Sequence, residues 1–83
     1  MKYIITTHGS PILFSEAIGH DEMARKFRGA TSAGFVSITA EGIGNGETVQ
    51  AELQVHCYGR SVSLGIGRSP KDRTAIENML LGY

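Results

Sequence analysis

Residues 47–67 read Glu-Thr-Val-Gln-Ala-Glu-Leu-Gln-Val-His-Cys-Tyr-Gly-Arg-Ser-Val-Ser-Leu-Gly-Ile-Gly, and this stretch decides more about the fold than any other. Apolar and polar residues alternate in its first part, up to Tyr58, which is typical of a β-strand with one buried face. The alternation resumes after Gly59-Arg60, and a glycine that opens a two-residue loop favours a type II′ turn. The stretch therefore predicts a β-hairpin in which Val55 faces Leu64 across the two strands.

The register of this hairpin separates two sets of side chains. The inward set is apolar, and it consists of Leu53, Val55, Cys57, Val62, Leu64 and Ile66. The outward set is polar or small, and within it Tyr58 faces Ser61. Because a slip of one residue would place the whole apolar set in water, we expect the register to be well specified.

The rest of the chain predicts three more strands and two helices. The strands are Lys2–Thr7, Pro11–Phe14 and Ala30–Ala40, the helices are Gly19–Phe27 and Ser69–Gly82, and a loop lies at Glu41–Gly46. Ser69 is a natural N-cap to which Asp72 can bond back, and Gly82 is a C-cap. The order β-β-α-β-β-β-α favours an α+β fold, with a mostly antiparallel five-stranded sheet and both helices on one face.

Two details of the N-terminal half bear on its histidines. A turn centred on His8-Gly9 would pair Tyr3 with Phe14, and the resulting hairpin is apolar on both faces. His8 is then a turn residue with an unusual φ, because histidine tolerates such conformations better than most residues. His20 is expected at the N-cap of the first helix, so neither histidine is predicted to be catalytic.

Length and composition limit the class of protein. The chain has 83 residues, which predicts a single domain over residues 1–83, and its 41% hydrophobic content is typical of a globular protein. Eight basic residues balance eight acidic ones, so a broad nucleic-acid-binding surface is not expected, while self-association is not opposed by charge. No stretch is long and apolar enough to span a membrane, and the N-terminus lacks the pattern of a signal peptide.

The single cysteine carries no predicted catalytic role. One cysteine excludes an intramolecular disulfide and a cysteine-based zinc site, and it suits a reducing cytoplasm. Cys57 follows His56, but neighbours on a strand point to opposite faces, so the two cannot form a dyad. The histidines lack a metal-ligand spacing. We therefore predict no enzymatic activity, no metal and no cofactor.

A basic group near the last helix offers an alternative function. Residues 65–70 superficially resemble a phosphate-binding loop, but the last glycine of a dinucleotide motif and the Lys-Ser/Thr of a P-loop are missing. The side chains of Arg68, Ser69, Lys71 and Arg73 could still hold an anion beside the free N–H groups of a helix start. Together with Arg60, they define the alternative of a nucleic-acid-binding or anion-binding protein.

Three short segments carry a resemblance to known proteins. They are Ser32-Ala33-Gly34-Phe35-Val36, Tyr58-Gly59-Arg60-Ser61-Val62-Ser63-Leu64-Gly65 and Ser69-Pro70-Lys71-Asp72. In these segments the chain resembles small uncharacterised proteins encoded in bacteriophages and prophages. The resemblance implies a bacterial cytoplasm, and it transfers no activity and no functional residues.

The outward face of the sheet is where we place the function. A solvated sheet face usually carries long charged side chains, whereas this one carries hydroxyls, amides and aromatic rings. The predicted protein-binding residues are His56, Tyr58, Gln54, Ser61, Ser63 and Phe35. Because few charges must be ordered or desolvated when such a face docks, we expect a small interaction module that binds its own copy or another protein.

Overall fold

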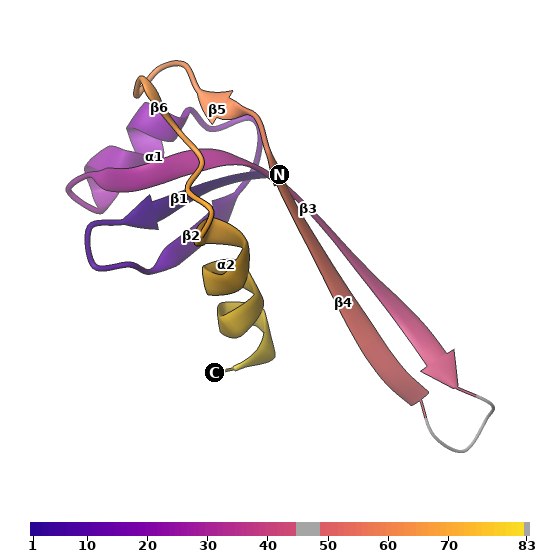
Figure 1. Cartoon of the computed structure of the whole chain (residues 1–83). Helices are drawn as coiled ribbons and strands as arrows, with labels where there is room; N and C mark the ends of the chain where they lie inside the picture. The colour runs from indigo at the N-terminus through magenta and orange to yellow at the C-terminus, as the bar shows by residue number, and fades with distance from the viewer. Residues whose placement is uncertain (45–48, 83) are drawn as a thin grey trace.

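A computed structural model describes residues 1–44 and 49–82 of the chain, with the backbone alone at positions 40–44 and 49–52. The elements follow in the order β1 (Lys2–Thr6), β2 (Pro11–Phe14), α1 (His20–Lys26), β3 (Ala30–Gly44), β4 (Val49–Tyr58), β5 (Arg60–Ser61), β6 (Ile66–Gly67) and α2 (Asp72–Leu81), as Figure 1 shows. The predicted α+β class is confirmed. In the described part of the chain, no helix has the length and hydropathy needed to cross a membrane.

The main sheet has four strands in the order β2-β1-β3-β4, and every neighbouring pair is antiparallel. The predicted antiparallel character is therefore confirmed, but the predicted five-stranded sheet is wrong. The segment expected to form a fifth strand makes only β5 and β6, which pair with each other in a separate two-stranded sheet.

The predicted hairpin between residues 47–58 and 61–67 does not form. β4 pairs instead with β3, in a register that runs from Phe35 opposite Tyr58 to Gly44 opposite Val49. β3 thus continues through most of the segment predicted to be a loop. The physical reason is ladder length: β3 pairs with all ten residues of β4, whereas the segment after Tyr58 is short and rich in serine and glycine. Val62, predicted to face inward, is 85% exposed.

The first hairpin forms one residue out of the predicted register. Lys2, not Tyr3, lies opposite Phe14, because the loop has three residues instead of two. Gly9 adopts a φ of +82°, and its N–H donates to the Thr6 carbonyl at 2.9 Å. A glycine in the left-handed region is typical of three-residue hairpin loops. The positive φ therefore belongs to the glycine, and the exposed His8 is an ordinary turn residue.

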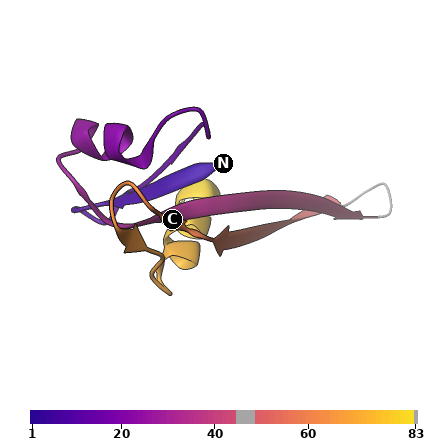
Figure 2. The same ribbon diagram turned by 90° about the horizontal axis from the view of Figure 1, so that it is seen from above.

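The two helices cover opposite faces of the sheet, as Figure 2 shows. Tyr3 and Ile5 of β1 pack with Ile76 of α2, whereas Ile4 packs with Met23 of α1. The prediction that both helices share one face is wrong. Its failure follows from β1, whose consecutive apolar residues point alternately to the two faces and require cover on both.

α1 begins at the residue that was predicted to be its N-cap, so the cap lies one residue earlier than predicted. Gly19 is the N-cap, and His20 is the first helical residue, with only 4% of its surface exposed. Its Nε2 lies 2.8 Å from the carbonyl oxygen of Gly34, and its ring meets Phe14 and Phe35 edge-on. His20 therefore joins α1 to β3 as a structural residue.

A buried carboxylate fixes the start of α2. Asp72 accepts hydrogen bonds from the Tyr3 hydroxyl at 2.6 Å, from the Ser32 hydroxyl at 2.6 Å and from the Ser69 N–H at 2.9 Å. The predicted bond from Asp72 back to Ser69 is confirmed, although the helix itself begins at Asp72 and Lys71 is the N-cap residue. The predicted C-cap is also confirmed, since Gly82 has a φ of +80°.

Past Lys2, the N-terminal end of β1, the strands β3 and β4 continue together as a two-stranded ribbon. β1 pairs with β3 only as far as Phe35, and in the described part of the chain the rest of β3 pairs with β4 alone. Figure 1 shows this ribbon projecting away from the two helices. We call residues 39–44 of β3 and 49–54 of β4, which pair with each other, the arm.

Candidate interaction site

Three rings lie in a row on the face of β3 and β4 that α1 leaves open. The register places Phe35 opposite Tyr58 and Ser37 opposite His56, so these residues share one face. The Phe35 and Tyr58 rings stack at 5.7 Å and 22°, and the His56 and Tyr58 rings stack at 5.7 Å and 17°. We call Phe35, Tyr58 and His56 the aromatic row.

The inner end of the aromatic row is fixed, and its outer end is exposed. Phe35 is partly buried and meets the buried His20 ring at 5.5 Å, whereas Tyr58 is 40% exposed and His56 is exposed. The aromatic row is therefore packed against the core at Phe35 and reaches solvent at Tyr58 and His56. It presents a phenol and an imidazole to solvent, and rings that already stack on each other lose less freedom when a partner docks.

Polar residues with short side chains surround the aromatic row. Ser37, Thr39 and Gln54 are exposed, and the register places Thr39 opposite Gln54 on the same face. Together with His56 and Tyr58, they form what we call the open face. It has hydrogen-bond donors and acceptors but no charged side chain among these five residues.

Two of the predicted binding residues lie elsewhere. Ser61 is fully buried, and its Oγ accepts a hydrogen bond from the Leu64 N–H at 3.2 Å, so it belongs to a turn. Ser63 is exposed in that turn, between β5 and β6. Their predicted place on the open face depends on the hairpin that does not form. The structure brings together the other four predicted residues, which are His56, Tyr58, Gln54 and Phe35.

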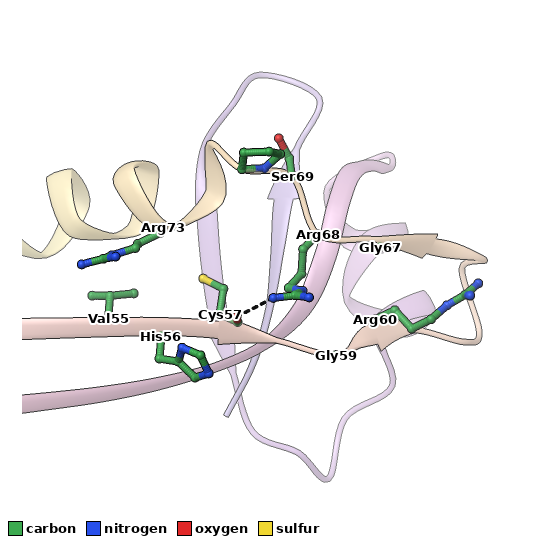
Figure 3. Close-up of a pocket in the computed structure, with 10 residues that line it drawn as sticks. Val55, His56, Cys57, Gly59, Arg60, Gly67, Arg68, Ser69 and Arg73 are labelled. Atoms are coloured by element: carbon green, nitrogen blue, oxygen red, sulfur yellow. Dashed lines mark hydrogen bonds between the residues drawn. The ribbon is translucent and has the colours of Figure 1, made fainter.

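A pocket of about 720 Å³ lies on the other side of β4, between this strand and the start of α2 (Figure 3). We call it the basic pocket. Its lining residues are Val55, His56, Cys57, Gly59, Arg60, Gly67, Arg68, Ser69, Pro70 and Arg73. None of these is acidic. The pocket thus includes most of the basic group that the sequence singled out, while Lys71 is not among its lining residues.

The arginines of the basic pocket do not converge on one point. The Arg68 Nη1 donates to the Cys57 carbonyl oxygen at 2.8 Å, and the Arg73 Nε donates to Glu77 at 2.7 Å. Figure 3 shows the Arg60 side chain pointing away from Cys57. Two of the three guanidinium groups already have protein partners, so a small anion would have to compete for them.

The start of α2 is also poorly suited to an anion. The Ser69 N–H donates to the Asp72 carboxylate, the Lys71 N–H donates to the Ser69 hydroxyl, and the Asp72 N–H donates to the Ser69 carbonyl. These groups are therefore not free, and the carboxylate already occupies the position that favours negative charge at a helix N-terminus. The predicted phosphate-loop alternative loses its main physical basis.

Cys57 is partly buried, and Figure 3 shows its sulfur and the His56 ring on opposite sides of β4. Burial raises the pKa of the Cys57 thiol; the Tyr3 hydroxyl and the Arg68 and Arg73 guanidinium groups lower this pKa but do not reverse the shift. The thiol is therefore protonated at neutral pH, which disfavours a nucleophile. In the described residues, no three His, Cys, Asp or Glu side chains are close enough to hold a metal ion.

Sequence reasoning missed the buried network around Asp72. Its members Tyr3, Ser32 and Asp72 come from β1, β3 and α2. Along the chain, Asp72 is 69 residues from Tyr3 and 40 residues from Ser32. Burial and the hydrogen bond to Asp72 raise the pKa of the Tyr3 hydroxyl well above its ordinary value. The only signal in the sequence was the spacing of Ser69 and Asp72, which indicates a helix start and nothing more.

No protein-family model, curated protein or solved structure matches this chain. The resemblance to phage-encoded proteins therefore stays a prediction.

Proposed function

We propose that this chain is a small non-enzymatic protein-interaction module that binds a protein partner through its open face. The observation that carries the proposal is the aromatic row, which is anchored by His20 at one end and exposed at Tyr58 and His56. The expected partner surface offers an apolar or aromatic side chain to the rings and hydrogen-bonding groups to the surrounding Ser37, Thr39 and Gln54.

The chemistry of the open face supports protein binding. Tyrosine is enriched at the centres of protein interfaces, because its ring packs while its hydroxyl finds a partner. The aromatic row is already stacked, so its rings lose little freedom when a partner docks. The absence of charged groups from the five residues of the open face also keeps the desolvation cost low.

Several features support the non-enzymatic part of the proposal. Cys57 and His56 point to opposite sides of β4, and the raised pKa of Cys57 keeps its thiol protonated. The alternative of nucleic-acid binding through Arg60, Arg68, Lys71 and Arg73 is weakened by the protein partners of Arg68 and Arg73. A bacterial cytoplasm and a phage or prophage origin are part of the same proposal, motivated by the lone cysteine and the sequence resemblance.

The test compares two variants of equal charge. His56→Glu/Tyr58→Glu alters the aromatic row, and Thr7→Glu/His8→Glu places two glutamates in the exposed β1–β2 turn instead. Both variants should remain folded by circular dichroism. Proteins captured from a bacterial lysate by the wild type and by the turn variant, but not by the face variant, are purified and their binding is measured by calorimetry.

We expect the face variant to bind the purified partner at least about 2 kcal/mol more weakly, which is a roughly thirtyfold higher Kd. The turn variant should bind as the wild type does. If no captured protein distinguishes the two variants, or if the purified partner binds both with equal affinity, the open face is not a binding surface. Tight binding of a labelled single-stranded oligonucleotide that weakens with salt would instead favour the nucleic-acid alternative.

A further inference from the structure

Three arginines line the basic pocket, and each comes from a different part of the chain. Arg60 belongs to β5, Arg68 follows β6, and Arg73 lies in the first turn of α2. All three residues are exposed, and none of the residues that line the pocket is acidic. The pocket therefore presents positive charge to solvent that no lining carboxylate neutralises.

The three arginines lie in series along β4. Figure 3 shows Arg73 at the level of Val55 and Arg68 at Cys57. It shows Arg60 beyond the end of the strand. The 2.8 Å bond from the Arg68 Nη1 to the Cys57 carbonyl oxygen fixes the middle of the series. Because Val55 and Cys57 are two residues apart on a strand, their separation is about 7 Å. We call Arg73, Arg68 and Arg60 the arginine series.

The arginine series keeps hydrogen-bond donors for a ligand. A guanidinium carries five N–H groups; Arg68 uses one of them for the Cys57 carbonyl, and Arg73 uses one for Glu77. Among the described residues, these bonds orient the two side chains and leave other N–H groups to donate to a ligand. Because the guanidinium groups do not converge, a ligand has to bring a separate negative group to each of them.

We propose that the arginine series binds an extended acidic segment of another protein, in which Asp or Glu occupies every second position. Alternate side chains of an extended chain point to the same side and repeat at about 7 Å, which matches a two-residue step of β4. The central acidic residue then faces Arg68, and the two others face Arg60 and Arg73. Arginine pairs with a carboxylate through charge-assisted hydrogen bonds, often two in parallel.

The sequence indicates that the acidic segment belongs to a different protein. The acidic residues of this chain are Glu16, Asp21, Glu22, Glu41, Glu47, Glu52, Asp72 and Glu77. No two of them are two positions apart, so a second copy does not supply alternating carboxylates from these 83 residues. A nucleic acid is disfavoured as the ligand, because the residues that line the pocket include no Phe, Tyr or Trp on which a base could stack.

This inference goes beyond the proposed function, because it uses the other side of β4. Figure 3 shows the His56 ring, which belongs to the open face, on the opposite side of β4 from the Cys57 sulfur. Tyr58→Ser removes an exposed ring of the open face without changing the charge, and this variant should bind an acidic peptide as the wild type does. Failure of the open face and failure of the arginine series are therefore distinguishable.

A synthetic peptide tests the proposal. The peptide Ser-Glu-Ser-Glu-Ser-Glu-Ser, blocked at both ends, is titrated into the wild-type protein at low salt and followed by amide NMR. We expect saturable binding with a Kd on the order of 1 mM or below. The amide signals of Cys57, Gly59 and Ser69 should shift, whereas those of Ser37 and Thr39 on the open face should not.

A second peptide of the same composition tests the spacing. In Ser-Ser-Glu-Glu-Glu-Ser-Ser the glutamates are consecutive, and consecutive side chains of an extended chain point to opposite sides. This peptide should bind about fivefold more weakly than the alternating peptide, because it cannot pair all three glutamates with the arginine series at once.

A charge exchange at Arg68 tests the order of the series. Arg68 lies in the middle, so it faces the central residue of the peptide whichever way the peptide runs. Arg68→Glu should raise the Kd of the alternating peptide at least about tenfold. The same variant should bind Ser-Glu-Ser-Lys-Ser-Glu-Ser more tightly than the wild type does, and this gain also shows that the variant is folded.

Arg73→Gln and Arg25→Gln form a matched pair of variants. Each removes one exposed arginine from an i,i+4 ion pair, Arg73 from Glu77 and Arg25 from Asp21, but only Arg73 lines the basic pocket. Arg73→Gln should raise the Kd of the alternating peptide about threefold to fivefold, and Arg25→Gln should leave it unchanged. Equal losses would show that the peptide responds only to net charge, which would refute the proposal.

Three other results would also refute it. They are no saturable binding of the alternating peptide up to about 10 mM, equal binding of the two glutamate peptides, and a folded Arg68→Glu variant that does not prefer the lysine peptide. If circular dichroism shows that Arg68→Glu is unfolded, the two glutamate peptides and the Arg73→Gln/Arg25→Gln pair decide. Tighter binding of a labelled oligothymidylate than of the alternating peptide would assign the arginine series to nucleic acid instead.

Discussion

Replacing Asp72 by alanine tests the network that joins α2 to the sheet. The Asp72 carboxylate is 2% exposed, and it accepts from Tyr3, Ser32 and Ser69. In the part of the chain that the structure describes, Asp72 forms no ion pair, so these three hydrogen bonds are what stabilise the buried charge. Removing the carboxylate leaves three donors without an acceptor.

The magnitude follows from how deeply each donor is buried. The Tyr3 residue is 0% and Ser32 is 4% exposed, and a buried donor left without a partner costs about 1–3 kcal/mol. The Ser69 N–H is only partly buried and can regain water, and removal of a buried charge offsets some of the loss. We therefore expect Asp72→Ala to lower the free energy of unfolding by about 2–4 kcal/mol, a large part of the 5–15 kcal/mol typical of a domain.

Urea unfolding followed by circular dichroism measures this change as a lower midpoint with an unchanged slope. Asp72→Asn is the matched control, because an amide keeps one oxygen for Tyr3 and Ser69 while its NH2 group can donate to the Ser32 oxygen. We expect it to lose about half as much as alanine. In a double-mutant cycle with Tyr3→Phe, the two losses should add up to more than the double variant loses. A loss below about 0.5 kcal/mol for Asp72→Ala, the usual range of a surface substitution, would refute the reasoning.

Three further predictions concern the aromatic row and the titratable groups. In urea unfolding, Gly59→Ala should destabilise the fold by more than Gly9→Ala. Both glycines have a positive φ, but only a Cβ at Gly59 would meet another side chain, the Phe35 ring at 2.8 Å. Equal losses would show that this contact is not tight. Cys57 should react slowly with a thiol reagent near neutral pH and rapidly in urea, because burial raises its pKa; equal rates would place it at the surface. The pKa of Tyr3 is higher in the folded than in the unfolded protein, so the stabilisation that Tyr3 provides is complete below pH 10.0, the ordinary pKa of tyrosine. Above this pH, the free energy of unfolding should fall by about 1.4 kcal/mol for each pH unit. Tyr3→Phe should remove this loss from the measured pH dependence of unfolding.

The local pattern of the chain was sufficient to predict most of its elements. Alternation over residues 49–58 predicted β4, because the two faces of a strand differ in exposure whichever strand it pairs with. Two features of α2 were also local: Asp72 reaches back only three residues to Ser69, although the N-cap is Lys71 and not Ser69, and Gly82 supplies the left-handed conformation of the C-cap. The polar and aromatic character of the open face followed from the same alternation, and it placed four of the six predicted binding residues on one surface.

Pairing and layering were decided only by the tertiary structure. The alternation of residues 61–67 matched that of β4, but β3 pairs with β4 along the full length of β4. The local sequence of a strand does not determine which of two possible partners gives the longer pairing. The two faces of β1 are both apolar, and only the assembled sheet shows that one helix is needed on each. The basic pocket depends on this pairing. It brings together residues from β4, β5 and α2, which are distant along the chain and become neighbours only in the assembled sheet.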